Sequence, residues 1–190
     1  MSETILMKTR EEAWRLLTEW TQSESLRKHA LAVEAAMRGA ARRTGADEHL
    51  YGLTGLLHDF DYERYPDPPD HPTKGAEVLR REGYPEEMVT AILGHATYTG
   101  VLRETPLART LFAVDELSGF LTAVAYVRPS RSLAEVEVSS VKKKLKDKAF
   151  ARSVSREDIM QGAAELGVDL DTHIANVLAD LQAEAEALGL

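Results

Sequence analysis

Apolar residues recur at helical spacing through nearly the whole sequence, which leaves the chain few ways to fold other than as packed helices. The runs are bounded by residues that can cap or end a helix. Thr9 with Glu12 makes a capping-box pattern, and Gly45 follows a run that Ser23 or Ser25 can open. The pattern predicts an all-α helical bundle, with helices near 9–20, 23–44, 47–58, 73–81, 85–95, 105–128, 139–150, 155–167 and 171–188.

Two stretches depart from this helical pattern. Regular helix is ruled out between residues 62 and 72 by four prolines: Pro66, Pro68, Pro69 and Pro72. A loop of this length inside a compact domain is often functional. Residues 132–138 show mild strand-like alternation, although we expect helix or loop there. No internal repeat or low-complexity linker divides the chain, so we expect a single domain over residues 1–190.

Composition and charge exclude several classes of protein. The net charge of −8 argues against binding to a nucleic acid polymer, but leaves a small phosphorylated molecule open as a ligand. The absence of cysteine excludes disulfides, thiolate metal sites and cysteine nucleophiles. The N-terminus does not resemble a signal peptide, and no uncharged apolar run is long enough to span a bilayer. We therefore expect a cytoplasmic protein without a membrane partner, and leave its oligomeric state open.

The dipeptide His58-Asp59 places two metal-ligating side chains at the end of an apolar helical run. Neighbouring residues on a helix point about 100° apart, so they rarely meet at one ion on the body of a helix. They can meet where the helix ends and the backbone turns. Residues 60–62 and the proline-rich loop after them supply such an end.

Two other residues sit where a metal would explain them. Asp115 lies within an apolar helix with no lysine or arginine one turn away, and an unpaired buried carboxylate is costly. His29 lies on a helix whose apolar side faces the core. A lone histidine is more often hydrogen-bonded than metal-bound, and we assign His49 and His173 in that way.

The ordered set of these residues resembles the HD-domain superfamily of metal-dependent phosphohydrolases. That pattern has a histidine on an early helix, a His-Asp pair ending a later one, and an aspartate on a long helix further on. Members with two metals add two histidines between the pair and the last aspartate. The matching residues here are His29, His58, Asp59, His71, His95 and Asp115. The similarity covers about residues 24–128 as an HD core, which leaves a C-terminal helical extension at about 130–190.

The resemblance implies one divalent metal bound by four ligands and a second metal bridged to it by Asp59. The first set would be His29, His58, Asp59 and Asp115, and the second would add His71 and His95. Imidazole and carboxylate ligands suit Mn, Fe, Co, Ni or Zn. A water activated by these metals would hydrolyse a phosphomonoester or phosphodiester of a nucleotide or another small phosphorylated substrate. An HD-type di-iron oxygenase with the same six ligands, and a non-enzymatic ligand-binding module with a structural metal, are the alternatives.

Further residues are candidates for catalysis and for substrate binding. Asp61 and Glu63, with Asp59, are candidate catalytic groups, and the first two could act as general acid or base or could instead cap the loop. Tyr62 stands where some relatives carry a lysine, so that phosphate contact is missing. The basic side chains that we expect to contact a phosphate are Lys74, Arg27, Arg128, Lys143 and Lys146. The lysines of 142–148 either line the mouth of the site or form a solvated helix face.

Overall fold

The structure is a computed structural model that describes residues 6–190. These residues form helices and no strand, which confirms the all-α prediction. In chain order the elements are α1 (Arg10–Trp20), α2 (Glu24–Thr44), α3 (Glu48–Leu57), α4 (Asp70–Arg81), α5 (Glu86–His95), η1 (Thr97–Thr99), α6 (Pro106–Tyr126), η2 (Leu133–Glu135), α7 (Val138–Lys146), α8 (Arg156–Leu166), α9 (Leu170–Ala183) and α10 (Ala185–Leu188). None of the helices within residues 6–190 is long and apolar enough to cross a membrane.

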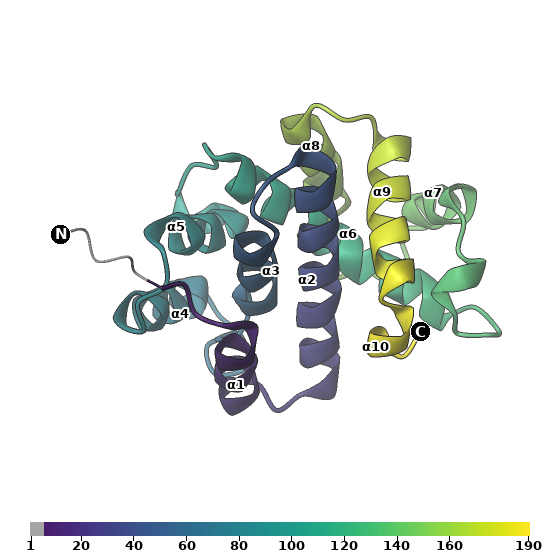
Figure 1. The fold of residues 1–190 in the computed structure, drawn as a ribbon. Coiled ribbons are helices and arrows are strands. Elements are labelled where there is room, and N and C mark those ends of the chain that lie inside the picture. The colour runs from purple at the N-terminus through teal and green to yellow at the C-terminus, as the bar shows by residue number, and fades with distance from the viewer. Residues whose placement is uncertain (1–5) are drawn as a thin grey trace.

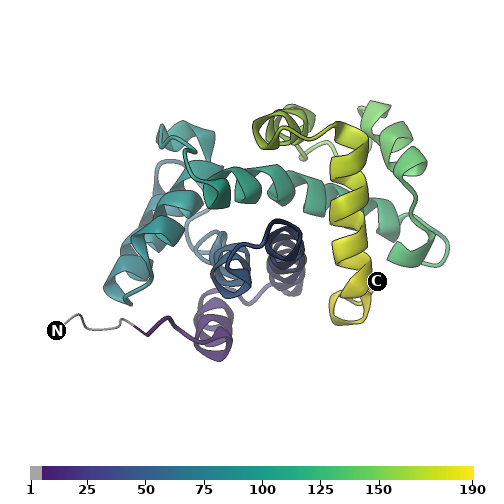
Figure 2. The ribbon, with the colours of Figure 1, turned by 45° about the horizontal axis from the view of Figure 1, so that its top comes forward.

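Helix α6 is the centre of the fold. It packs against α2, α5, α8 and α9, and Figure 2 shows it crossing the molecule with α2 and α3 on one side and α8 on the other. Helix α2 lies between α3 and α9, as Figure 1 shows. The core-facing side chains of α6, among them Leu111, Leu117, Phe120 and Leu121, are fully buried. This burial fixes which side of α6 faces α2, and therefore where Asp115 can point.

The predicted helix starts at Thr9 and at Ser23 are confirmed by their capping contacts. The Thr9 hydroxyl accepts a hydrogen bond from the Glu12 amide at 3.1 Å, and the Glu12 carboxylate accepts one from the Thr9 amide at 2.7 Å. Ser23 rather than Ser25 caps α2, and Gly45 ends it in the left-handed conformation, with φ of 73°. These local contacts satisfy backbone N–H and C=O groups that have no partner within the helix. The capping residues in the sequence are therefore enough to predict where these helices begin or end.

Two predicted helices are shorter than expected. The helix expected over 139–150 ends at Lys146, because the Arg156 guanidinium binds the carbonyls of the turn that follows. Its contacts include the carbonyls of Asp147 at 3.1 Å and Ala151 at 2.7 Å. The helix expected over 171–188 is broken at Glu184, after which Leu188 lies in the core. The strand-like alternation near residue 136 gives only the short turn η2.

The proline-rich segment places a histidine at a bend. Helix α4 is drawn from Asp70, but His71 and Pro72 have non-helical backbone angles, so regular helix begins at Thr73 as predicted. His71 is extended, with φ of −81° and ψ of 133°. Its side chain is therefore carried on the loop between α3 and α4, beside the end of α3.

The C-terminal helices pack on the same core. Helix α8 lies against α6, and α9 lies against both α6 and α2. Gly162 of α8 approaches Ala113 of α6 so closely that an added Cβ would lie 2.5 Å from the Ala113 Cα. The C-terminal extension therefore covers the helix that carries Asp115. The expected domain boundaries stay a prediction.

Candidate metal centre

The six histidine and aspartate side chains singled out by the sequence come together from five segments. They are His29 on α2, His58 at the end of α3, Asp59 directly after it, His71 at the bend of α4, His95 at the end of α5 and Asp115 on α6. They form two groups that share Asp59. In each group one ligand atom per residue lies within 4.8 Å of all the others.

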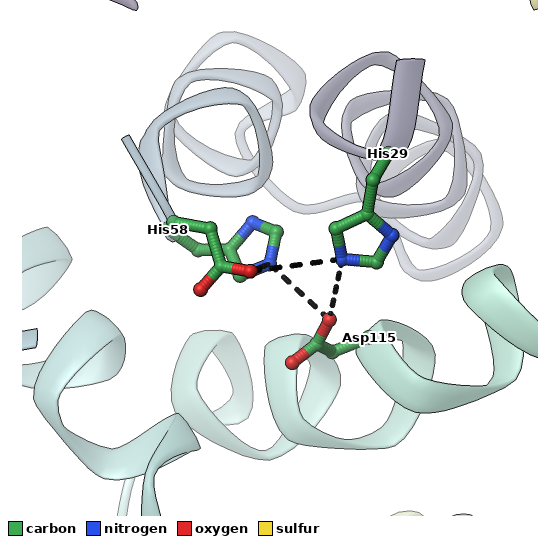
Figure 3. A group of neighbouring side chains, drawn as sticks. His29, His58 and Asp115 are labelled. Atoms are coloured by element: carbon green, nitrogen blue, oxygen red, sulfur yellow. Dashed lines mark hydrogen bonds and ion pairs between the residues drawn. The ribbon is translucent and has the colours of Figure 1, made fainter. Parts of the chain in front are cut away.

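The first group lies between α2, the end of α3 and α6 (Figure 3). The Asp115 Oδ1 is 3.0 Å from the His29 Nε2 and 3.2 Å from the His58 Nε2. The Asp59 Oδ2 lies 3.3 Å from the same nitrogen of His58 and 3.9 Å from that of His29. Three helical segments thus direct four ligand atoms at one point.

The second group uses the other oxygen of Asp59. Its Oδ1 lies 3.2 Å from the His71 Nε2 and 3.2 Å from the His95 Nε2. The two oxygens of one carboxylate therefore face two different sets of imidazoles. This is the arrangement that a bridging carboxylate needs.

Hydrogen bonds on the far side of three imidazole rings fix which nitrogen faces inward. The His58 Nδ1 donates to the Gly55 carbonyl at 2.7 Å, the His95 Nδ1 donates to the Ile92 carbonyl, and the His71 Nδ1 donates to the Asp61 Oδ1 at 2.7 Å. In a neutral imidazole the opposite nitrogen, Nε2, then carries a lone pair. Such outer partners are usual for metal-ligating histidines.

The spacing and burial of the inward-facing atoms also fit a bound metal. The His58 Nε2 is buried without a hydrogen-bond partner in the described chain. Lone pairs of nitrogen and carboxylate oxygen that face each other at about 3 Å repel unless a proton or a metal ion lies between them. Two ligands bound at about 2.1 Å and about 90° apart are themselves about 3 Å apart. The residues present therefore fit a divalent metal.

The close packing of these side chains shifts the pKa values of several of them. Burial disfavours the charged imidazole of His58, but Asp59 and Asp115 outweigh it and raise the pKa of His58 well above its usual value. Burial likewise opposes ionisation of Asp115, yet His58 lowers its pKa. The pKa of His71 rises to about 9, because Asp59 and Asp61 outweigh its burial. Burial and the charge of Asp115 raise the pKa of Glu116 to about 7.

Asp61 and Glu63 differ from the expected acid–base role. Asp61 is 1% exposed, does not line the cavity, and accepts hydrogen bonds from the His71 Nδ1 at 2.7 Å and the Gly75 amide at 2.8 Å. It therefore orients His71 from behind. Glu63 accepts from the amides of Gln22 and Ser23 at 2.6 and 2.8 Å, so it holds the turn between α1 and α2.

A cavity of about 560 Å³ opens onto the two groups. Besides the candidate ligands, its lining includes two tyrosines and two carboxylates: Tyr62, Tyr98, Glu116 and Asp158. Tyr98, Glu116 and Asp158 were not predicted as site residues from the sequence. Glu116 could have been found because it follows Asp115 directly, whereas Asp158 reaches the cavity only through the packing of α8 on α6.

The basic residues expected at a phosphate do not line this cavity. Arg27 donates to the carbonyls of Thr21 and Thr18 at the end of α1, and Arg128 donates to the Glu135 carbonyl. Lys143 and Lys146 are exposed on α7, and Lys74 lies on α4 outside the cavity lining. These residues were predicted from their nearness to a candidate ligand along the chain or, for Lys143 and Lys146, from a cluster of lysines. Neither feature fixes where a long side chain points.

Imidazole and carboxylate ligands gathered from separate helices around one shared aspartate define an all-α protein with a candidate metal centre. Residues 26–119 match the family model described as HD domain. The chain belongs to the HD-domain superfamily, as the order of its histidines and aspartates predicted. All six candidate ligands lie inside the matched residues, whereas Asp158 lies outside them. No solved structure matches the chain.

Proposed function

We propose that the protein is a metal-dependent hydrolase that cleaves phosphoester bonds of a small phosphorylated molecule, such as a nucleotide. The main support for this proposal is the position of Asp59, because its two oxygens face two separate sets of imidazoles beneath an open cavity. Membership of the HD-domain superfamily supports metal-dependent hydrolysis as the reaction class.

The candidate ligands form two neighbouring metal-binding positions that share Asp59. His29, His58, Asp59 and Asp115 would hold one ion, and Asp59, His71 and His95 would hold the other. Divalent ions of the Mn, Fe, Co, Ni and Zn series, when bound, acidify water and offset the charge of a phosphoryl group. Asp61 keeps the His71 Nε2 aimed inward, while Tyr62 and Tyr98 bound the space that a substrate would occupy.

The shape of the site favours catalysis over a purely structural metal. A structural metal site is normally closed by its protein ligands, whereas a catalytic one keeps a position open to water or substrate. Here the side chains of Asp59 and His29 are 23% and 24% exposed and line a cavity large enough for a small organic substrate.

Metal analysis of the purified protein, followed by phosphatase and phosphodiesterase assays with Mn, Co and Fe, tests the proposal. We expect about two ions per chain and release of phosphate from a phosphomonoester or cleavage of a phosphodiester. Asp59→Ala should lose metal and activity together, because it removes the ligand shared by both groups. Turnover by Asp59→Ala would contradict the assignment, and two irons with oxygen consumption but no hydrolysis would point to the oxygenase instead.

A further inference from the structure

The charge of the cavity wall is unusual for a site that receives a phosphorylated molecule. No lysine or arginine among the described residues lines the cavity over the candidate metal centre. Apart from the candidate ligands, the ionisable groups that face it are two tyrosines and two carboxylates, Glu116 and Asp158. A bound phosphate would therefore meet no lysine or arginine of residues 6–190 there, and its charge would be balanced at the metal centre.

The two carboxylates differ in what they already bind. Glu116 Oε2 accepts a hydrogen bond from the Ser155 amide at 2.8 Å, which commits one of its oxygens. The Asp158 carboxylate, in the first turn of α8, has no hydrogen bond or ion pair within the described chain; only its backbone amide is bound, by the Ser155 hydroxyl. Asp158 is therefore available to a ligand.

The negative wall continues away from the metal centre. Asp158 and Thr97 also line an adjoining cavity of about 780 Å³, together with Glu104, Glu157 and Glu165. Its single basic residue, Arg103, donates to Glu165 at 2.6 and 2.8 Å and to the Gly94 carbonyl at 3.0 Å. The one basic side chain among the described residues that lines this cavity is therefore already paired with a carboxylate.

These charges discriminate between substrates. A second phosphate or a carboxylate would lose its hydration and face carboxylates of like charge. A protonated amine would instead pair with Asp158, and the aromatic rings of Tyr62 and Tyr98, which line the same cavity, are groups that attract a cation. Pairing with an aspartate in a partly exposed position raises the affinity for a cationic ligand roughly tenfold over that for a neutral ligand of the same shape.

We infer that the cavity selects monophosphate esters whose alcohol part carries a protonated amine, and that Asp158 determines this preference. The inference rests on the proposed function, since it takes the metal centre as the holder of the phosphate. It names the substrate class that the site accepts and excludes nucleoside triphosphates and other polyanions.

Binding of three matched phosphonates to the metal-loaded protein, measured by calorimetry without oxygen, tests the inference. The probes are 3-aminopropylphosphonate, butylphosphonate and 4-phosphonobutyrate, which differ in the charge at the end of the same short chain and contain no ester to hydrolyse. We expect the amine to bind about tenfold more tightly than the butyl compound, and the carboxylate about tenfold more weakly.

Three variants sharpen the result. Asp158→Asn should bring the three affinities to within about threefold, and Asp158→Lys should reverse their order. Glu77→Gln, an equal change of charge at an exposed position of α4 outside the cavity, should keep the wild-type order. The inference is overturned if the carboxylate binds as tightly as the amine, if the order survives in Asp158→Asn, or if none of the probes binds.

A separate phosphate-release assay decides the proposed function by itself. Hydrolysis of phosphomonoesters without any preference for the amine would remove only the inference about Asp158. Preference for the amine without release of phosphate would remove only the proposed hydrolysis.

Discussion

At the scale of single residues, the centre depends as much on the outward-facing atoms of its histidines as on the inward-facing ones. The Nδ1 atoms of His58 and His95 donate to carbonyls of their own helical turn. Each of these hydrogen bonds is therefore made as soon as the end of its helix is folded. His71 has no such carbonyl, because it sits at the bend before α4, and Asp61 supplies the acceptor instead.

Replacement of Asp61 by asparagine should weaken metal binding at the second group. An asparagine can offer its oxygen to only one of the two donors, the His71 Nδ1 or the Gly75 amide. We expect about 10- to 100-fold weaker affinity for one of the two ions, measured by competition with a chelator. Asp67→Asn, in the exposed loop nearby, should leave both affinities unchanged; an equal loss in that control would contradict the role of Asp61.

A buried histidine outside the centre should make stability depend on pH. His173 is 3% exposed, and its Nε2 donates to the Ala113 carbonyl at 2.8 Å. Burial lowers its pKa below the ordinary value of about 6.5, so the unfolded chain takes up the proton first as the pH falls. This stabilising contribution is therefore complete above about pH 6.5 and is lost as the pH falls through the lowered pKa.

His173→Gln should reduce this dependence, because glutamine can donate to the same carbonyl without titrating. In urea unfolding between pH 7 and pH 5, the wild type should lose up to about 1.4 kcal/mol more per pH unit than the variant. Equal slopes for the two proteins would show that folding does not lower the pKa of His173.

The residue types of the centre were predictable, but the directions of long side chains were not. The order of histidines and aspartates identified the six residues that the structure brings together. The same reasoning placed Arg27 at the substrate, whereas its guanidinium is held by carbonyls at the end of α1. Spacing along a helix fixes a short side chain, but a guanidinium binds whichever acceptor the tertiary structure offers.

At the scale of elements, helix starts were predictable and some helix ends were not. A cap such as Thr9 or Asp47 acts within one turn, so its effect can be deduced from neighbouring residues. The end of α7 depends on Arg156, which lies beyond the turn that it stabilises. No pattern in the neighbouring residues predicts that contact, so the helix predicted over 139–150 is longer than α7.

The contact of α8 with α6 should be sensitive to a single methyl group. Gly162→Ala would place a Cβ against the backbone of Ala113, which cannot move as a side-chain end can. We expect a loss of about 1–3 kcal/mol in the free energy of unfolding, measured by urea denaturation. Ala164→Ser adds one atom on the exposed side of the same helix and should change stability by less than about 0.5 kcal/mol. Equal losses in the two variants would contradict close packing at Gly162.

At the scale of the whole molecule, the cavity is built by two parts of the chain. The candidate ligands lie within residues 26–119, which match the HD domain. Ser153, Val154 and Asp158, which lie beyond them, close one wall of the cavity. The C-terminal extension, which the sequence presented only as additional helices, therefore shapes what the centre can admit.

Removal of metal should destabilise the entire fold, because the candidate ligands connect α2, α4, α5, α6 and the end of α3. At a metal concentration about 1,000 times the dissociation constant, binding contributes about 4 kcal/mol to stability. A chelator should lower the melting temperature by several degrees, and added Mn or Co should restore it. Asp59→Ala should show no response to either, and an equal response in that variant would contradict the shared role of Asp59.

The distribution of the ligands along the chain also has a consequence for synthesis. His29 and Asp115 meet although they are 86 positions apart in the sequence, and His95 reaches the shared Asp59 from a different helix. During translation the early histidine leaves the ribosome well before the aspartate that completes its group. A chain that stops before α6 lacks that aspartate altogether. Binding of an ion by the first group would therefore require a chain that extends past Asp115, and a product truncated before α6 is left with an incomplete set of ligands.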